Sequence, residues 1–268
     1  MNIINNKKDG KKHIHKETML KIHKETMIKI YKRPYQLKFN YKPIIPLKIF
    51  QTWYTKDLPQ AMKERVENLK TMHPRFEHFL FDDNDCRQFI QDHFNTDILN
   101  AYDRLIPGAY KADLWRCCVL YIHGGIYMDI KLKCINGFRL IELTENNHYV
   151  RDRIPPLSIY NALIVSQPRS PFLWKAICRI VINTNKQFYG KSALEPTGPT
   201  MLGKIIIRNK LNPNIDLTHY HDGGYIIYKN RFVISTEYLE YNTERTKLYN
   251  SINSKRYDVL WNERKVYK

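Results

Sequence analysis

The sequence predicts an α/β fold in which helices sandwich a mixed central sheet. Over the first ~130 residues, segments that alternate like strands follow segments with helical spacing, in the order strand, helix, strand, three helices, strand. The hydrophobic content of 43% and the aromatic content of 13% are enough for a sizeable core in a chain of 268 residues. We expect one such domain over residues 44–268, preceded by an N-terminal extension over residues 1–43.

The predicted extension is polar, basic and of low complexity. It contains a tandem octapeptide repeat, HKETMLKI at 15–22 and HKETMIKI at 23–30. Two copies are too few for a solenoid. One interpretation is a slipped duplication in a weakly ordered segment. The other is a short basic helix that makes a peripheral contact with a membrane surface or with a partner.

The domain is expected to open with two strand–helix pairs. Residues 47–50 form the first predicted strand, which ends in the triplet Gln51, Thr52 and Trp53. Apolar side chains then recur at the spacing of one helical face; they are Met62, Val66, Leu69 and Met72. Residues 76–81 alternate as a second strand, and Asp82 or Asp83 caps the helix after it. A further short helix is predicted over residues 97–105.

The stretch from Lys111 to Lys133, KADLWRCCVLYIHGGIYMDIKLK, organises the domain. Its predicted helix, over residues 110–122, is apolar on nearly every side, which is typical of a buried helix. Yet Asp113 and Arg116 are three residues apart and therefore share a face. Buried charges must be paired with each other or must meet a ligand or a metal. These two residues are therefore candidate site residues.

A Gly-Gly pair at 124–125 is expected to turn the chain from this helix into a strand over residues 126–133. Strand alternation puts Tyr127, Asp129 and Lys131 on one face. In open α/β sheets, ligands bind beyond the carboxyl ends of the strands. Asp129 and Lys131 fit that place. The alternative, an exposed edge strand beside a surface Asp–Arg pair, is equally compatible with the residues alone.

The second half of the chain shows looser alternation. We expect a buried strand over residues 159–166, an apolar helix ending near residue 207, and a hairpin over residues 225–234. Between the strand and the apolar helix lies a long helix over residues 172–188. Four of its side chains are expected to face inward: Trp174, Ile177, Cys178 and Val181. His219 and His221 are weak candidates for metal ligands, because no Cys-rich or Glu-rich segment is near them in sequence.

The formal net charge of +18 suits an anionic partner, which could be nucleic acid, an acidic membrane or a phosphorylated small molecule. Part of this charge is explained equally well by a bias towards AT-rich codons. No run reaches the ~18 apolar residues of a membrane span, and the N-terminus lacks the apolar region of a secretory signal. The five cysteines are odd in number and show no CxxC spacing, which favours a reducing, cytoplasmic location and argues against zinc.

Three blocks of the sequence resemble the glycosyltransferase family named for its sugar-binding region with a DXD motif. They are IFQTW at 49–53, ADLWR at 112–116 continuing to GGIYMD at 124–129, and Asn161 with TGP at 197–199. The family includes initiating α-1,6-mannosyltransferases and capsular polysaccharide synthesis proteins, and is distantly similar to glucosylating clostridial toxins. The resemblance implies a GT-A fold and a retaining transferase. Such an enzyme moves a sugar from a UDP- or GDP-sugar to a glycan or protein acceptor.

The resemblance also implies roles for single residues. Trp53 would stack on the base, and Asp113 with Arg116 would grip the hydroxyls of the donor sugar. Tyr127 would lie near the ribose. Asp129 would be the first Asp of DXD and would meet the ribose and a Mn²⁺ or Mg²⁺ ion. Five further candidates come from the matching blocks: Gln51, Thr52, Ala112, Asn161 and Gly198. Trp261 lies in the C-terminal segment and would close over the diphosphate, as C-terminal aromatic residues do in related enzymes.

Lys131 departs from the family pattern, because most members have the second, metal-binding Asp at this position. A protonated lysine cannot bind a cation, but its ammonium group can neutralise part of the diphosphate charge that the metal would otherwise neutralise. We therefore expect weaker metal dependence.

Two alternatives to this function remain: a related domain that binds nucleotide-sugar without catalysis, and a basic nucleic-acid-binding protein. The chain has no recognisable nucleic-acid module, so no specific nucleic acid is expected.

Overall fold

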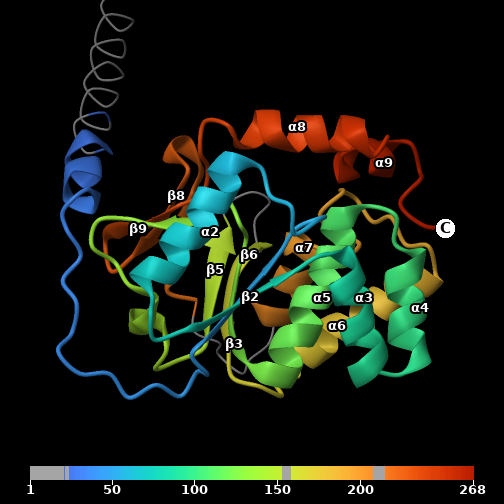
Figure 1. Cartoon of the computed structure of the whole chain (residues 1–268), viewed down its shortest axis with the longest axis horizontal. Coiled ribbons are helices and arrows are strands. Elements are labelled where there is room, and N and C mark those ends of the chain that lie inside the picture. The colour runs from blue at the N-terminus through green and yellow to red at the C-terminus, as the bar shows by residue number, and fades with distance from the viewer. Residues whose placement is uncertain (1–20, 22–23, 153–157, 208–214) are drawn as a thin grey trace, which may run out of the picture.

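The computed structural model describes residues 21, 24–152, 158–207 and 215–268, and Figure 1 shows their arrangement. The described strands form one mixed sheet in the order β2-β1-β3-β6-β5-β7-β8-β9-β4. The predicted α/β class with a mixed central sheet is therefore confirmed. The first octapeptide copy, except for Lys21, lies outside the described residues. Among the described residues, no helix is both long enough and apolar enough to cross a membrane.

The strands are short except for β6. Their bounds are β1 Lys48–Thr52, β2 Glu77–Phe81, β3 Gly125–Met128, β4 Lys133–Cys134, β5 His148–Asp152, β6 Ser158–Ser166, β7 Leu217–Tyr220, β8 Tyr225–Tyr228 and β9 Arg231–Ser235. The helices are α2 Gln60–Met72, α3 Asp83–His93, α4 Thr96–Arg104, α5 Gly108–His123, α6 Pro171–Asn185, α7 Pro199–Ile206, α8 Tyr241–Ser251 and α9 Tyr257–Asn262. Two 3₁₀ turns cover Leu140–Leu143 and His221–Gly223.

The sheet has a parallel part and a largely antiparallel part. β1 pairs in parallel with both β2 and β3, whereas β3 pairs with β6 in the antiparallel sense. Only four residues separate β3 from β4 in the chain, yet these strands occupy the third and the last positions of the sheet. The sheet must therefore curl, so that the turn over residues 129–132 connects its two parts.

Helices cover the sheet unequally. In Figure 1, α3, α4, α5 and α6 gather on one side, α2 lies on the other, and α8 and α9 cross the top. Asp82 caps α3, since its side chain accepts a hydrogen bond from the backbone N–H of Asp85 and the Asp85 side chain accepts one in return. None of the residues of α8 is fully buried. The predicted cap is thus confirmed, and α8 is the helix least attached to the core.

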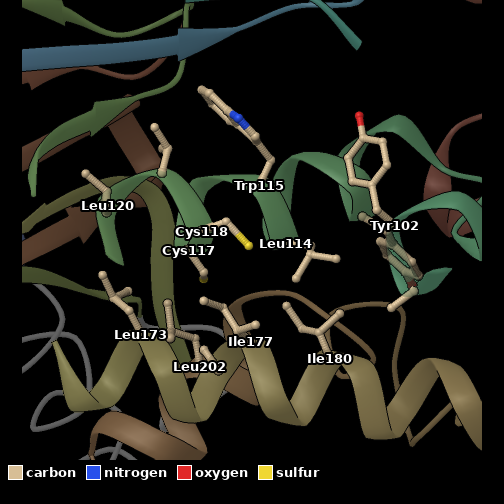
Figure 2. Packing of buried hydrophobic residues seen from close by; sticks show 14 of the residues in the cluster. Tyr102, Leu114, Trp115, Cys117, Cys118, Leu120, Leu173, Ile177, Ile180 and Leu202 are labelled. Carbon is tan, nitrogen blue, oxygen red and sulfur yellow. The ribbon is translucent and has the colours of Figure 1, made fainter. Parts of the chain in front are cut away.

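Helix α5 packs against α6, as Figure 2 shows. Ile177 is buried as predicted, but the rest of the buried face differs from the predicted one, because the other buried apolar side chains are Leu173, Ala176 and Ile180. Trp174 is instead 41% exposed, and its ring lies against Tyr121. Both faces of α6 are apolar, so helical spacing alone did not decide which one meets α5.

The N-terminal segment contacts the domain before residue 44. A helix covers residues 24–31, and Tyr35 is buried with its hydroxyl donating to Glu142 at 2.6 Å. The backbone N–H groups of Ile44 and Ile45 both donate to the carbonyl of Thr144. The predicted boundary at residue 43 stays a prediction, but Tyr35 already belongs to the apolar core beside β8 and β9.

Burial of His73 gives the fold a specific acid sensitivity. The side chain is 4% exposed, its Nε2 has no hydrogen-bond partner, and burial lowers its pKa to about 4. Because the folded pKa lies below the unfolded one, protonation favours unfolding, so this stability is complete above pH 6.5 and is lost as the pH falls towards 4. We expect His73→Gln to remove about 2 kcal/mol of the stability difference between pH 7 and pH 5.

Urea unfolding of the native chain and of the His73→Gln variant at both pH values measures this difference. The comparison is needed because Asp83, whose pKa is raised to about 6 by burial, titrates with the opposite sign in the same range. Equal pH dependence of the two proteins would contradict the prediction.

Candidate active site

The site lies at the carboxyl ends of two neighbouring parallel strands. Trp53 follows β1 and Asp129 follows β3. β3 ends at Met128, and the backbone N–H of Leu132 donates to the carbonyl of Asp129, which closes a turn. The predicted alternation is therefore wrong beyond Met128. Because Lys131 lies in this turn and not on a strand, the backbone of the turn sets the direction of its side chain.

Asp113 is the centre of the buried part of the site. Only 7% of the residue is exposed, and each carboxylate oxygen accepts one hydrogen bond, Oδ1 from Asn161 Nδ2 at 2.7 Å and Oδ2 from Thr197 Oγ1 at 2.8 Å. Burial raises the pKa of this carboxyl, and Arg116 acts in the opposite direction. A Cβ on Gly198 would lie 3.3 Å from Oδ2, so a small residue suits this position.

Arg116 connects the two carboxylates. Its Nη2 lies 3.4 Å from Asp113 Oδ1 and its Nη1 lies 3.7 Å from Asp129 Oδ1. The guanidinium also donates to two backbone carbonyls, from Nε to Ala112 at 3.1 Å and from Nη1 to Asn161 at 2.6 Å. Its side chain is only 7% exposed. The alternative of a surface Asp–Arg pair is therefore wrong.

Tyr127 links this ion network to the exposed part of the site. Its ring lies under the guanidinium of Arg116, 4.3 Å from Cζ, and its hydroxyl donates to Asp129 Oδ1 at 2.7 Å. Burial raises the pKa of the Tyr127 phenol well above its usual value, so the phenol remains a donor. The Asp129 side chain keeps 26% of its surface exposed, which leaves it accessible to a ligand.

An aromatic and cationic cluster lies beyond Asp129. The ring of Tyr241, the first residue of α8, is 6.3 Å from the ring of Trp53. The Nζ of Lys131 lies 5.6 Å from the Tyr241 ring and 5.8 Å from the Tyr160 ring. Burial raises the pKa of both tyrosines, and the negative charge of Asp129 adds to this effect. The turn after β3, the end of β1 and the start of α8 therefore meet at one place.

Comparison with known proteins identifies the central part of this site. Residues 59–149 match the family described as "Glycosyltransferase sugar-binding region containing DXD motif". This part of the chain resembles a glycosyltransferase sugar-binding region. The region includes Asp113, Arg116, Tyr127 and Asp129. The family resemblance predicted from the sequence is therefore confirmed.

Several of the similar proteins are mannosyltransferases. The chain is 33% identical over 131 residues to inositol phosphoceramide mannosyltransferase 2 of Schizosaccharomyces pombe, covering 49% of this chain and 37% of that protein. Inositol phosphoceramide mannosyltransferase 3 of the same yeast is 27% identical over 187 residues, covering 69% and 51%. The chain thus spans between about a third and a half of these relatives. The solved structure of PaToxG glycosyltransferase aligns with a TM-score of 0.48 and 17% identity, covering 74% of this chain and 79% of that one.

Three predicted site residues make their hydrogen bonds outside the sugar-binding region's ion network. Gln51 is buried and pairs with His78 at 2.8 Å, because the two residues lie on the same face of the neighbouring strands β1 and β2. Thr52 donates to the carbonyl of Phe81, and Trp261 donates from Nε1 to the carbonyl of Tyr189 at 2.7 Å. Their predicted roles in nucleotide binding stay predictions.

Two tyrosines of the site were missed by sequence reasoning. Tyr160 precedes the predicted Asn161, so its place in strand β6 was a usable signal. Tyr241 lies more than a hundred residues beyond Asp129 in a polar helix, and nothing in the local sequence singles it out. Thr197 belongs to a matching block, but its hydrogen bond to Asp113 required the fold.

Proposed function

We propose that the chain is a retaining hexosyltransferase that moves a sugar from a UDP- or GDP-sugar to a hydroxyl of an acceptor. The ion network around Asp113 carries this proposal. An ionised carboxylate can accept about four hydrogen bonds, and Asp113 receives only two from Asn161 and Thr197. Its remaining acceptor positions, next to the donor groups of Arg116, suit the hydroxyl groups of a sugar.

The relatives' names give the first candidates for donor sugar and acceptor. Both are mannosyltransferases that act on inositol phosphoceramide. We therefore infer mannose as the first sugar to test. Beside glycans and proteins, an inositol-containing sphingolipid is the first acceptor to test. The odd number of cysteines and the lack of CxxC spacing support the reducing, cytoplasmic location that we propose.

In this proposal the side chains of the site orient the donor, and the protein itself forms no covalent bond with it. Trp53 offers an aromatic face for the base, and the partly exposed Asp129 accepts hydrogen bonds from the ribose. Arg116 holds both carboxylates in place by its two backbone and two ionic contacts. Orientation and electrostatic stabilisation would then supply most of the acceleration.

A donor screen tests the proposal. Purified full-length chain is incubated with UDP-glucose, UDP-galactose, UDP-N-acetylglucosamine and GDP-mannose, with and without acceptor, and release of the nucleoside diphosphate is measured. NMR of the product gives the anomeric configuration. Release from one donor with retained configuration supports the proposal. Binding of a nucleotide-sugar without turnover would favour the non-catalytic alternative, and the absence of binding would contradict both.

Asp113→Asn is expected to lower kcat/KM for the active donor by roughly 100-fold, about 2.7 kcal/mol, because a charged acceptor in a buried site becomes neutral. The substitution keeps the size of the side chain. Asp103→Asn is the matched control: Asp103 lies on α4, where it pairs with Arg87 at the surface. Loss of activity in both variants, or in neither, would remove the assigned role of Asp113.

A further inference from the structure

The carboxylates of the site do not fit a resident divalent cation. Such an ion prefers several oxygen ligands. In the part of the chain that the structure describes, no group of three or more His, Cys, Asp or Glu residues could hold a metal. Both oxygens of Asp113 already accept hydrogen bonds, and Asp129 Oδ1 accepts one from Tyr127 with Arg116 nearby. Asp129 therefore offers one uncommitted oxygen, and the metal role predicted for it stays a prediction.

Lys131 lies where the second acidic residue of a DXD motif would lie. The turn that begins at Asp129 places it between the rings of Tyr160 and Tyr241, which are within 6 Å of its Nζ. Among the described residues, no carboxylate oxygen lies within 4 Å of this ammonium group. A half-buried cation that is held by aromatic rings but lacks an anion is available to a ligand anion.

Two arginines accompany Lys131. Arg65 on α2 donates from Nη1 to the carbonyl of Lys131 at 3.3 Å and stacks on the Tyr238 ring at 4.4 Å. Arg245, one turn into α8, lies 5.2 Å from the Tyr241 ring. Neither guanidinium has a carboxylate within 4 Å in the described parts of the chain. Lys131 and Arg245 thus lie against the Tyr241 ring, and Arg65 lies against the turn of Lys131 and the neighbouring Tyr238 ring.

We propose that Lys131, supported by Arg65 and Arg245, binds the diphosphate of the donor and takes the place of a metal ion. This inference rests on the proposed function, since it assigns the diphosphate part of the same donor. In transfer, the bond between C1 of the sugar and the diphosphate oxygen breaks, and its electron pair stays on that oxygen. The acceptor oxygen bonds to C1, and its proton passes to the departing phosphate oxygen. Lys131 stabilises the charge that develops there.

Binding of UDP and GDP to the full-length chain, measured by calorimetry in EDTA and in Mn²⁺, tests this assignment without relying on turnover. We expect the nucleotide that binds to do so equally well in both buffers. Lys131→Met is expected to weaken its binding roughly tenfold or more, the usual size of a charge-assisted contact to phosphate. Lys133→Met is the matched control, because it removes the same charge from an exposed residue on β4. We expect it to bind as the native chain does.

A second variant, Lys131→Asp, restores the Asp-x-Asp pattern and is expected to bind the nucleotide only when Mn²⁺ is present. The inference is overturned if EDTA abolishes binding to the native chain, or if Lys131→Met binds as tightly as Lys133→Met. Both outcomes leave the proposed function standing. Failure of both nucleotides to bind in either buffer would instead contradict the proposed function and this inference together.

Discussion

Replacing Arg116 by methionine is expected to lower the free energy of unfolding by about 3–5 kcal/mol, the usual cost of leaving one partner of a buried ion pair behind. Methionine fills much of the space of the arginine stem. The loss of stability therefore comes more from the missing charge than from the missing volume. The Asp113 carboxylate would remain buried without its cation, and Asp129 would lose its nearest positive charge. Two backbone carbonyls, of Ala112 and Asn161, would also lose the hydrogen bond that the guanidinium donates.

Urea unfolding at pH 7 measures the effect of this substitution. Arg87→Met is the matched control, because Arg87 also pairs with an aspartate, Asp103, to which it donates two hydrogen bonds, but at the surface. Solvent screens such a pair, and little change in stability is expected. Adding Asp113→Asn to Arg116→Met should recover part of the loss, since it removes the uncompensated charge. Equal stability of Arg116→Met and Arg87→Met would contradict the assignment of a buried ion pair.

The sequence located the centre of the site but could not predict all of its partners. An apolar helix with two charges three residues apart predicted a buried pair, and Asp113 and Arg116 form one. The reason is local, because helical spacing alone places both on one face. Their other partners, Asn161 and Thr197, are more than forty residues away and reach Asp113 only through the pairing of β6 and the start of α7. Such contacts depend on the tertiary fold.

The wrong predictions also arose where tertiary contacts decide the local structure. Alternation in the sequence continues through Lys133, but the strand stops at Met128, because β4 must leave β3 and pair with β9 at the far edge of the sheet. Helix α6 has apolar residues on two faces, and contact with α5 decided between them. Tyr241 reaches the site from a helix in which no residue is fully buried. In each of these three cases, the local sequence pattern was compatible with more than one tertiary arrangement.

Gly125→Ala is expected to destabilise the fold by roughly 2–6 kcal/mol, the sum of backbone strain and overpacking. Gly125 begins β3 with a φ of +105°, a conformation that residues with a Cβ rarely adopt. A Cβ at this position would lie 2.7 Å from the backbone carbonyl oxygen of Lys48. That oxygen belongs to β1, whose pairing with β2 and β3 fixes its position. The strand cannot give way without moving Asp129, four residues further on.

Gly108→Ala supplies the comparison. Gly108 is the first residue of α5, its φ is not positive, and no atom lies within 4 Å of the position that an alanine Cβ would take. Alanine should therefore be neutral or slightly stabilising there. Thermal or urea unfolding of both variants measures the difference in their stability. Nucleotide binding by Gly125→Ala should weaken together with its stability, because strand β3 positions the turn that contains Lys131. If both alanine variants unfold at the same urea concentration as the native chain, the close approach of β3 to β1 does not constrain the site.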